Sequence, residues 1–122
     1  MIAGMNPVIR PGAFVFAVSE DTRLSASAFA VIREDEGTTL ILPENIAAVE
    51  GLETTGPFAC ITLQIHSALD GVGLTAAVSA ALAAQDIPAN VVAGAHHDHI
   101  FVPIDRADDA LTALRAAQSA SM

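Results

Sequence analysis

Apolar and polar residues alternate with a period of two in several short segments, which is the pattern of strands that bury one face. The clearest is 58–65 (FACITLQI). Its residues on one face are Ala59, Ile61, Leu63 and Ile65, and those on the other are Phe58, Cys60, Thr62 and Gln64. The predicted strands are 13–18, 28–33, 38–42, 58–65, 89–95 and 99–102.

The period becomes helical at Gly73 and ends before Pro88. The apolar stripe of this predicted helix is Leu74, Ala77, Val78, Ala81 and Leu82, the spacing of one helix face. A short helix is predicted over 44–49, after Pro43. A last helix is predicted behind Asp105 as its N-cap, with Asp108 three residues on. It should bury Ala107, Ala110, Leu111 and Leu114.

The remaining segments are expected to be turns and loops. Residues 1–12 contain Pro7, Pro11 and Gly12 and predict an irregular arm. Gly56-Pro57 predicts a break in the chain. The run Glu34-Asp35-Glu36-Gly37 predicts the tip of a hairpin over 28–42, and we favour a solvated tip over a cation site.

Composition excludes several classes of function. The chain has 122 residues, a formal net charge of -9 and five scattered arginines as its only Lys or Arg residues, so it should not bind nucleic acid. The least charged stretch, 71–97, contains polar residues and a helical period, so no membrane span is expected. Cys60 is the single cysteine, no leader peptide is recognised, and a cytoplasmic location is expected.

The run Asp70-Gly71-Val72-Gly73-Leu74 resembles the D-x-x-G-hydrophobic loop between the first strand and first helix of ACT domains. The helix that follows and Asn90-Val91-Val92 are similar to that family too. The hairpin tip and the run 97–103 (HDHIFVP) resemble a subgroup of small stand-alone ACT-like proteins that pack two such halves in one chain. The resemblance covers residues 13–116.

This resemblance implies an α+β, ferredoxin-like βαββαβ fold, with an antiparallel sheet and helices on one face. It also implies the domain organisation. After the 1–12 arm, a first, abbreviated half would span 13–65 and a second half 58–122, with the strand 58–65 shared. The first half lacks room for a full first helix, and Val72 replaces the family's usual proline. The second half is therefore the better candidate for a working site.

The resemblance further implies a non-catalytic module that senses an amino acid or similar metabolite. An assembly module without a ligand and an enzyme that uses His and Asp are the alternatives. Two glycines leave the backbone open to a ligand, and amides at a helix start favour a carboxylate. We expect the ligand to contact His66, Ser67, Asp70, Gly71, Val72, Gly73, Leu74 and Asn90.

The other chemical motifs point less clearly to function. Strand alternation puts His97 and His99 on one face and His96 and Asp98 on the other, so neither a metal site nor a cofactor is expected. We favour a polar strand end whose Asp98 and His99 bond to neighbouring loops. Cys60 has no basic residue beside it in sequence and should be an ordinary strand residue. No catalytic residue is predicted.

Self-association, as a homodimer, is expected from the helix after Gly73. The outer face of this helix has no charged residue, which is unusual for a surface exposed to solvent. That face consists of Thr75, Ala76, Ser79, Ala80, Ala83 and Ala84.

Overall fold

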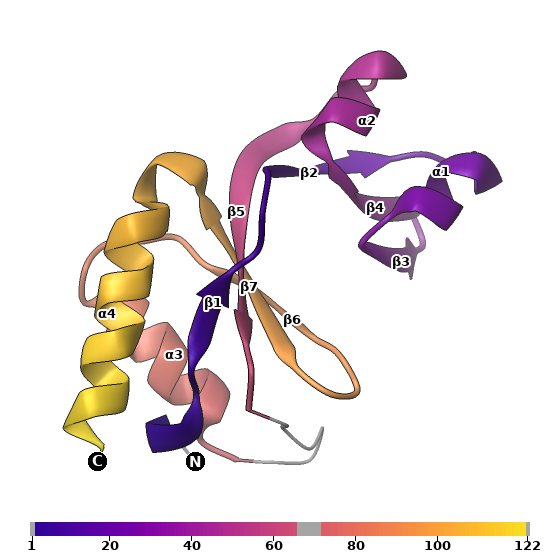
Figure 1. Cartoon of the computed structure of the whole chain (residues 1–122). Coiled ribbons are helices and arrows are strands. Elements are labelled where there is room, and N and C mark those ends of the chain that lie inside the picture. Colours follow the sequence, from indigo (N-terminus) through magenta and orange to yellow (C-terminus); the bar gives the residue numbers. More distant parts are fainter. Residues whose placement is uncertain (1, 66–71, 122) are drawn as a thin grey trace. The chain divides into compact units, whose positions relative to one another are not determined.

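The structure is a computed structural model that describes residues 2–65 and 72–121. The contacts between residues divide the chain into two compact units (Figure 1). Unit 1 consists of Met1–Pro11 and Ala59–Met122, and unit 2 consists of Gly12–Phe58.

Unit 2 has the order strand, helix, strand, strand, helix, strand. Its strands pair antiparallel in the order β3-β4-β2-β5, with β2 and β4 adjacent at the centre. This is the ferredoxin-like arrangement. The elements are β2 (Phe14–Val18), α1 (Thr22–Ser27), β3 (Ala30–Glu34), β4 (Gly37–Pro43), α2 (Glu44–Val49) and the start of β5 (Thr55–Leu63).

Unit 1 has the same topology, but its fourth strand comes from the beginning of the chain. The strand order is β1-β5-β7-β6. The elements from the N-terminal segment are the 3-10 turn η1 (Ile2–Gly4) and β1 (Pro7–Ile9). The later elements are β5, α3 (Leu74–Ala83), β6 (Asn90–Ala93), β7 (Asp98–Pro103), η2 (Ile104–Arg106) and α4 (Ala107–Ala120).

The expectation of an irregular arm over 1–12 is therefore wrong for part of that segment. Residues Pro7–Ile9 form β1, which pairs antiparallel with β5 through the partners Pro7 and Leu63. Met5, just before β1, is 1% exposed and lies in the core of unit 1. Proline is compatible with this position because β1 is an edge strand.

The expected break at Gly56-Pro57 is also wrong, since both residues lie inside β5. The register between β2 and β5 shifts here, with Phe14 opposite Phe58 but Phe16 opposite Thr55. Such a shift is a bulge, which lets a strand bend and continue through glycine and proline.

Each unit buries one face of its sheet against its own helices. In unit 1 the alternation of β5 is confirmed, because Ala59, Ile61 and Leu63 lie in the core. The helical stripe is confirmed as well, with Leu74, Val78 and Leu82 buried. The core of unit 2 joins β2 and β4 to both helices through Val15, Ala17, Leu24, Leu40, Leu42 and Ala47.

The start of the last helix differs from the prediction. Asp105 is not the N-cap, because it lies in η2, and α4 begins after Arg106 without a capping side chain. Pro103 precedes η2, and a 3-10 turn of this kind is frequent at the N-terminus of an α-helix. Within residues 2–65 and 72–121, no helix has the length and hydropathy needed to cross a bilayer.

Candidate functional site

The predicted ligand loop is only partly within the described residues. His66, Ser67, Asp70 and Gly71 lie outside them. Val72 is 88% exposed, whereas Leu74 is 5% exposed and packs into the core of unit 1. Of these neighbouring residues, Val72 thus offers a side chain to the surface and Leu74 does not.

Gly73 stands at the N-cap position of α3 with a φ of +104°. An added Cβ would meet nothing within 4 Å, so the space beside this glycine is open. The backbone conformation, rather than crowding, therefore requires glycine here. The first amides of α3 have no side-chain cap from Gly73, and a helix start of this kind favours an anionic group.

Gly73 stands at the N-terminal end of α3, whereas Asn90 follows the C-terminal end of this helix. It is the exposed first residue of β6 and pairs with Phe101. The ten residues of α3 span about 15 Å, and β6 starts only after this helix has ended. A single unit 1 therefore does not bring Gly73 and Asn90 together.

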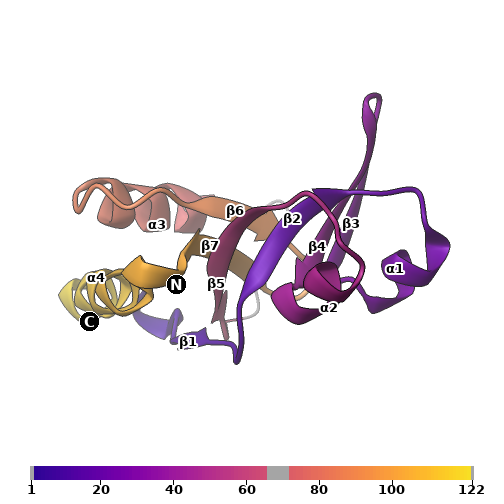
Figure 2. The same ribbon diagram turned by 90° about the horizontal axis from the view of Figure 1, so that it is seen from above.

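The β6 side of unit 1 presents an edge strand next to an uncharged helix face. β6 is the last strand in the order β1-β5-β7-β6. Figure 2 shows α3 on the β6 side of this unit and α4 on the β1 side. The six residues predicted for the outer face of α3 are all exposed: Thr75, Ala76, Ser79, Ala80, Ala83 and Ala84.

His97 and His99 bond to β5 and to the residues just after it. The His97 Nδ1 atom lies 3.2 Å from the Ile65 carbonyl oxygen, and the His99 Nδ1 atom lies 2.9 Å from the Thr62 hydroxyl. One partner of His99 is thus a residue of β5. Asp98 is 7% exposed on the opposite, core-facing side of β7. Among the residues that the structure describes, no three His, Cys, Asp or Glu side chains gather in the manner of metal ligands.

Burial lowers the pKa of His99 below its ordinary value of 6.5, and the positive charges of Arg10 and His97 act in the same direction. The Asp98 carboxylate opposes this shift. His99 therefore stays neutral at neutral pH.

Arg10 is a basic neighbour of Cys60 that sequence reasoning missed. Its amide donates to the Cys60 carbonyl oxygen at 2.8 Å, and its charge acts to lower the pKa of the Cys60 thiol. Burial outweighs this effect and raises that pKa to about 11. The two residues are far apart in sequence, and only the pairing of β1 with β5 brings them together.

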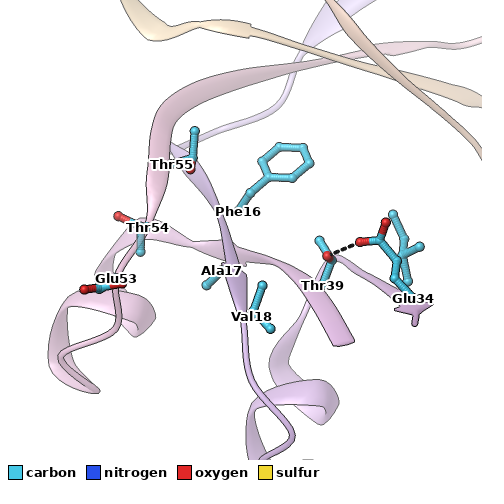
Figure 3. Close-up of a pocket in the computed structure, with 9 residues that line it drawn as sticks. Phe16, Ala17, Val18, Glu34, Thr39, Glu53, Thr54 and Thr55 are labelled. Atoms are coloured by element: carbon cyan, nitrogen blue, oxygen red, sulfur yellow. Dashed lines mark hydrogen bonds between the residues drawn. The ribbon is translucent and has the colours of Figure 1, made fainter. Parts of the chain in front are cut away.

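Unit 2 has a hollow of about 600 Å³ that the sequence did not predict (Figure 3). It is open to the surface, and we refer to it below as the cavity. Residues of β2, β3 and β4 line it, together with the first residue of β5 and the two residues before that strand. The residues that line it are Phe16, Ala17, Val18, Ile32, Glu34, Thr39, Glu53, Thr54 and Thr55.

Glu34 is exposed, as the solvated hairpin tip expected from the sequence requires, and it also lines this cavity. It is the last residue of β3, and its carboxylate accepts a hydrogen bond from the Thr39 hydroxyl (Figure 3). Ile32 pairs with Thr39, and strand alternation puts Glu34 on the same face as Ile32. Asp35 and Glu36 form the exposed turn, as expected.

Comparisons with known proteins agree with the topology of both units. One family profile described as an ACT domain matches residues 56–116, and a second matches residues 1–59. None of the curated proteins matches the chain in sequence.

Solved structures show the same fold. A protein of unknown function from Vibrio cholerae, described as a possible transport protein, is 41% identical over 97% of this chain and 93% of that chain, with a TM-score of 0.87. A protein from Agrobacterium tumefaciens is 19% identical over 92% and 87%, with a TM-score of 0.75. The regulatory subunit of aspartate kinase from Thermus thermophilus is 12% identical over 93% and 97%, with a TM-score of 0.69.

Proposed function

We propose that this chain, which belongs to the ACT-domain family, is a non-catalytic regulatory module that binds an amino acid or a similar small metabolite between two copies of itself. The observation that supports this proposal is the separation of Gly73 from Asn90. A ligand that contacts both residues needs a second copy of unit 1. The cytoplasmic location expected from the sequence stays a prediction.

Antiparallel pairing of two β6 strands would supply that second copy. In such a pair, the start of one β6 lies beside the end of the other. The end of β6 leads into the turn before His97, and His97 contacts the Ile65 carbonyl at the start of the ligand loop. Asn90 of one copy would therefore approach the ligand loop of its partner.

The chemistry of the proposed site suits an amino acid. The amides of residues 72–74 at the start of α3 would bind the carboxylate, and the helix dipole favours its negative charge. The Asn90 amide can donate and accept, so it can bind either group of the ligand. His66, Ser67 and Asp70 would supply further polar contacts from the loop, and Val72 would contribute an apolar one. The Leu74 side chain lies in the core, so this residue would take part through its amide.

The test is a search for an amino acid that raises the melting temperature, followed by calorimetric titration of two variants. Gly73→Val should block approach to the amides, and Asn90→Ala should remove the contact from the partner. Each variant alone should lose at least about tenfold in affinity. Gly51→Val is the matched control, because Gly51 also has a positive φ and open space but lies in unit 2.

Mixing the two defective variants tests whether the site lies between copies. A mixed dimer contains one intact site, made by the wild-type loop of one chain and Asn90 of the other. Mixing should therefore restore binding in the mixed dimers, at one site per dimer. Absence of restoration, with both variants folded and dimeric, would contradict a site between copies.

An assembly module without a ligand is the second candidate, and the uncharged outer face of α3 favours it. This candidate predicts a stable dimer whose melting temperature responds to no amino acid. The same thermal screen therefore separates the two functions.

A further inference from the structure

We propose that the cavity in unit 2 is a second binding site, and that it takes a small primary aliphatic amine in its ammonium form. This site is distinct from the loop before α3, because the nine described residues that line it belong to unit 2.

The charges around the cavity select a cation. Glu34 and Glu53 are the ionisable groups among its nine described lining residues, and none of the nine is Lys, Arg or His. The formal net charge of -9 adds a negative field around the whole chain. An anion would be repelled here, whereas a cation gains from both effects.

The apolar lining favours an organic cation over a metal ion. Val18 and Ile32 are 64% and 40% exposed, so their side chains offer hydrocarbon surface to a ligand. The Phe16 ring lies on the same face of the sheet (Figure 3) and adds apolar surface for the hydrocarbon part of a ligand. Two carboxylates are also too few for a protein site that holds a divalent metal without several waters.

A hydroxyl group in the cavity also suits an ammonium ion, because the three N–H donors of that ion need hydrogen-bond acceptors. Thr39 already donates to Glu34, so its oxygen keeps lone pairs with which it can accept. Thr54 and Thr55 lie on the other side of β2, two strand spacings from Thr39, so they are not partners of the same ammonium group. The ammonium group would lie near Glu34 and Thr39, and the hydrocarbon chain would lie along Val18 toward Phe16.

The test is an NMR titration of the labelled, full-length chain with n-butylamine at neutral pH. Backbone amide signals of residues in and beside the cavity, such as Phe16, Val18 and Thr39, should shift saturably. Two probes of equal length separate charge from hydrophobicity. 1-Butanol should bind more weakly, and butyrate should not bind.

The variant Glu34→Gln should weaken butylamine binding roughly two- to fivefold, the range measured for exposed ion pairs. Glu53→Gln should also weaken it, while Glu36→Gln, on the exposed turn, removes the same charge and should leave binding unchanged. Gly73→Val should not affect it, which keeps this result independent of the loop site. Equal binding of butanol and butylamine, or equal losses in Glu34→Gln and Glu36→Gln, would overturn the proposal.

Discussion

The Thr62 hydroxyl and the His99 imidazole lie 2.9 Å apart, and their hydrogen bond joins β5 to β7 on the sheet face away from the helices of unit 1. The pKa of His99 is lowered in the folded chain. The unfolded chain therefore binds this proton near pH 6.5, while the folded chain binds it only at lower pH. The stability linked to His99 is present above pH 6.5 and is lost as the pH falls from there through the folded-state pKa.

Replacement of His99 by Gln should flatten this pH dependence. Glutamine can still bond to Thr62 but does not titrate, so the free energy of unfolding should fall less between pH 7 and pH 5. Urea unfolding at several pH values measures the effect. A His99→Gln variant that keeps the wild-type pH dependence would contradict the assignment.

A second prediction concerns the N-terminal segment. Met5 is 1% exposed in the core of unit 1, so Met5→Ala should lower the free energy of unfolding by about 2–4 kcal/mol. Val8→Ala is the control from the neighbouring strand, because Val8 is 40% exposed and should lose less than about 1 kcal/mol. Equal losses in the two variants, measured by urea unfolding, would argue that this segment is not part of the core.

The same segment shows why sequence alone could not give the whole fold. The nine residues of β5 alternate long enough to fix both its type and its buried face. β1 has three residues, one of them proline, and too few positions for any period to appear. It is a strand because Leu63, far along the chain, pairs with Pro7.

The candidate sites, too, could be predicted from the sequence only in part. The glycine before α3 could be predicted, since Gly73 opens a helix and has the positive φ that favours glycine. The cavity in unit 2 could not be predicted, because the face on which Glu34 lies depends on the pairing of Ile32 with Thr39. A carboxylate next to a turn has no local pattern that shows which side chains of other strands lie beside it.

A third prediction concerns the single thiol. Since burial raises the pKa of Cys60 to about 11, roughly one molecule in a thousand holds a thiolate at pH 8. The side chain is also fully buried. Native protein should therefore react with a thiol reagent very slowly at pH 8, and the rate should rise to that of an exposed thiol in 6 M guanidinium. Fast labelling of native protein would contradict the burial of Cys60.

A fourth prediction concerns the turn beside the cavity. Gly37 has a φ of +147°, and a Cβ there would lie 2.9 Å from the Val18 Cγ1 atom. Gly37→Ala should lower the free energy of unfolding by about 1–3 kcal/mol, from backbone strain and the displaced valine. Gly51→Ala tests strain alone, because Gly51 has a positive φ with open space around it. A smaller loss at Gly37 than at Gly51 would show that Val18 moves aside easily.

The last prediction tests how two copies associate. The outer face of α3 is exposed and has no charged residue, and β6 beside it has an unpaired edge in the described sheet of unit 1. If this surface joins two copies, Ala80→Glu places a carboxylate from each chain in the interface. Burial of such a charge without a partner costs several kcal/mol, so the dimer should weaken by more than about 100-fold.

The folded monomer should tolerate this substitution. Glutamate is a good helix former, and Ala80 is exposed in the single chain, so its melting temperature as a monomer should change little. Ala116→Glu is the matched control, because Ala116 is an exposed alanine on α4, on the other side of unit 1. Sedimentation at high micromolar concentration should show monomers for Ala80→Glu and dimers for the wild type and the control. Dimers in all three proteins would locate the interface elsewhere, and would also remove the geometry that brings Asn90 toward a partner's Gly73.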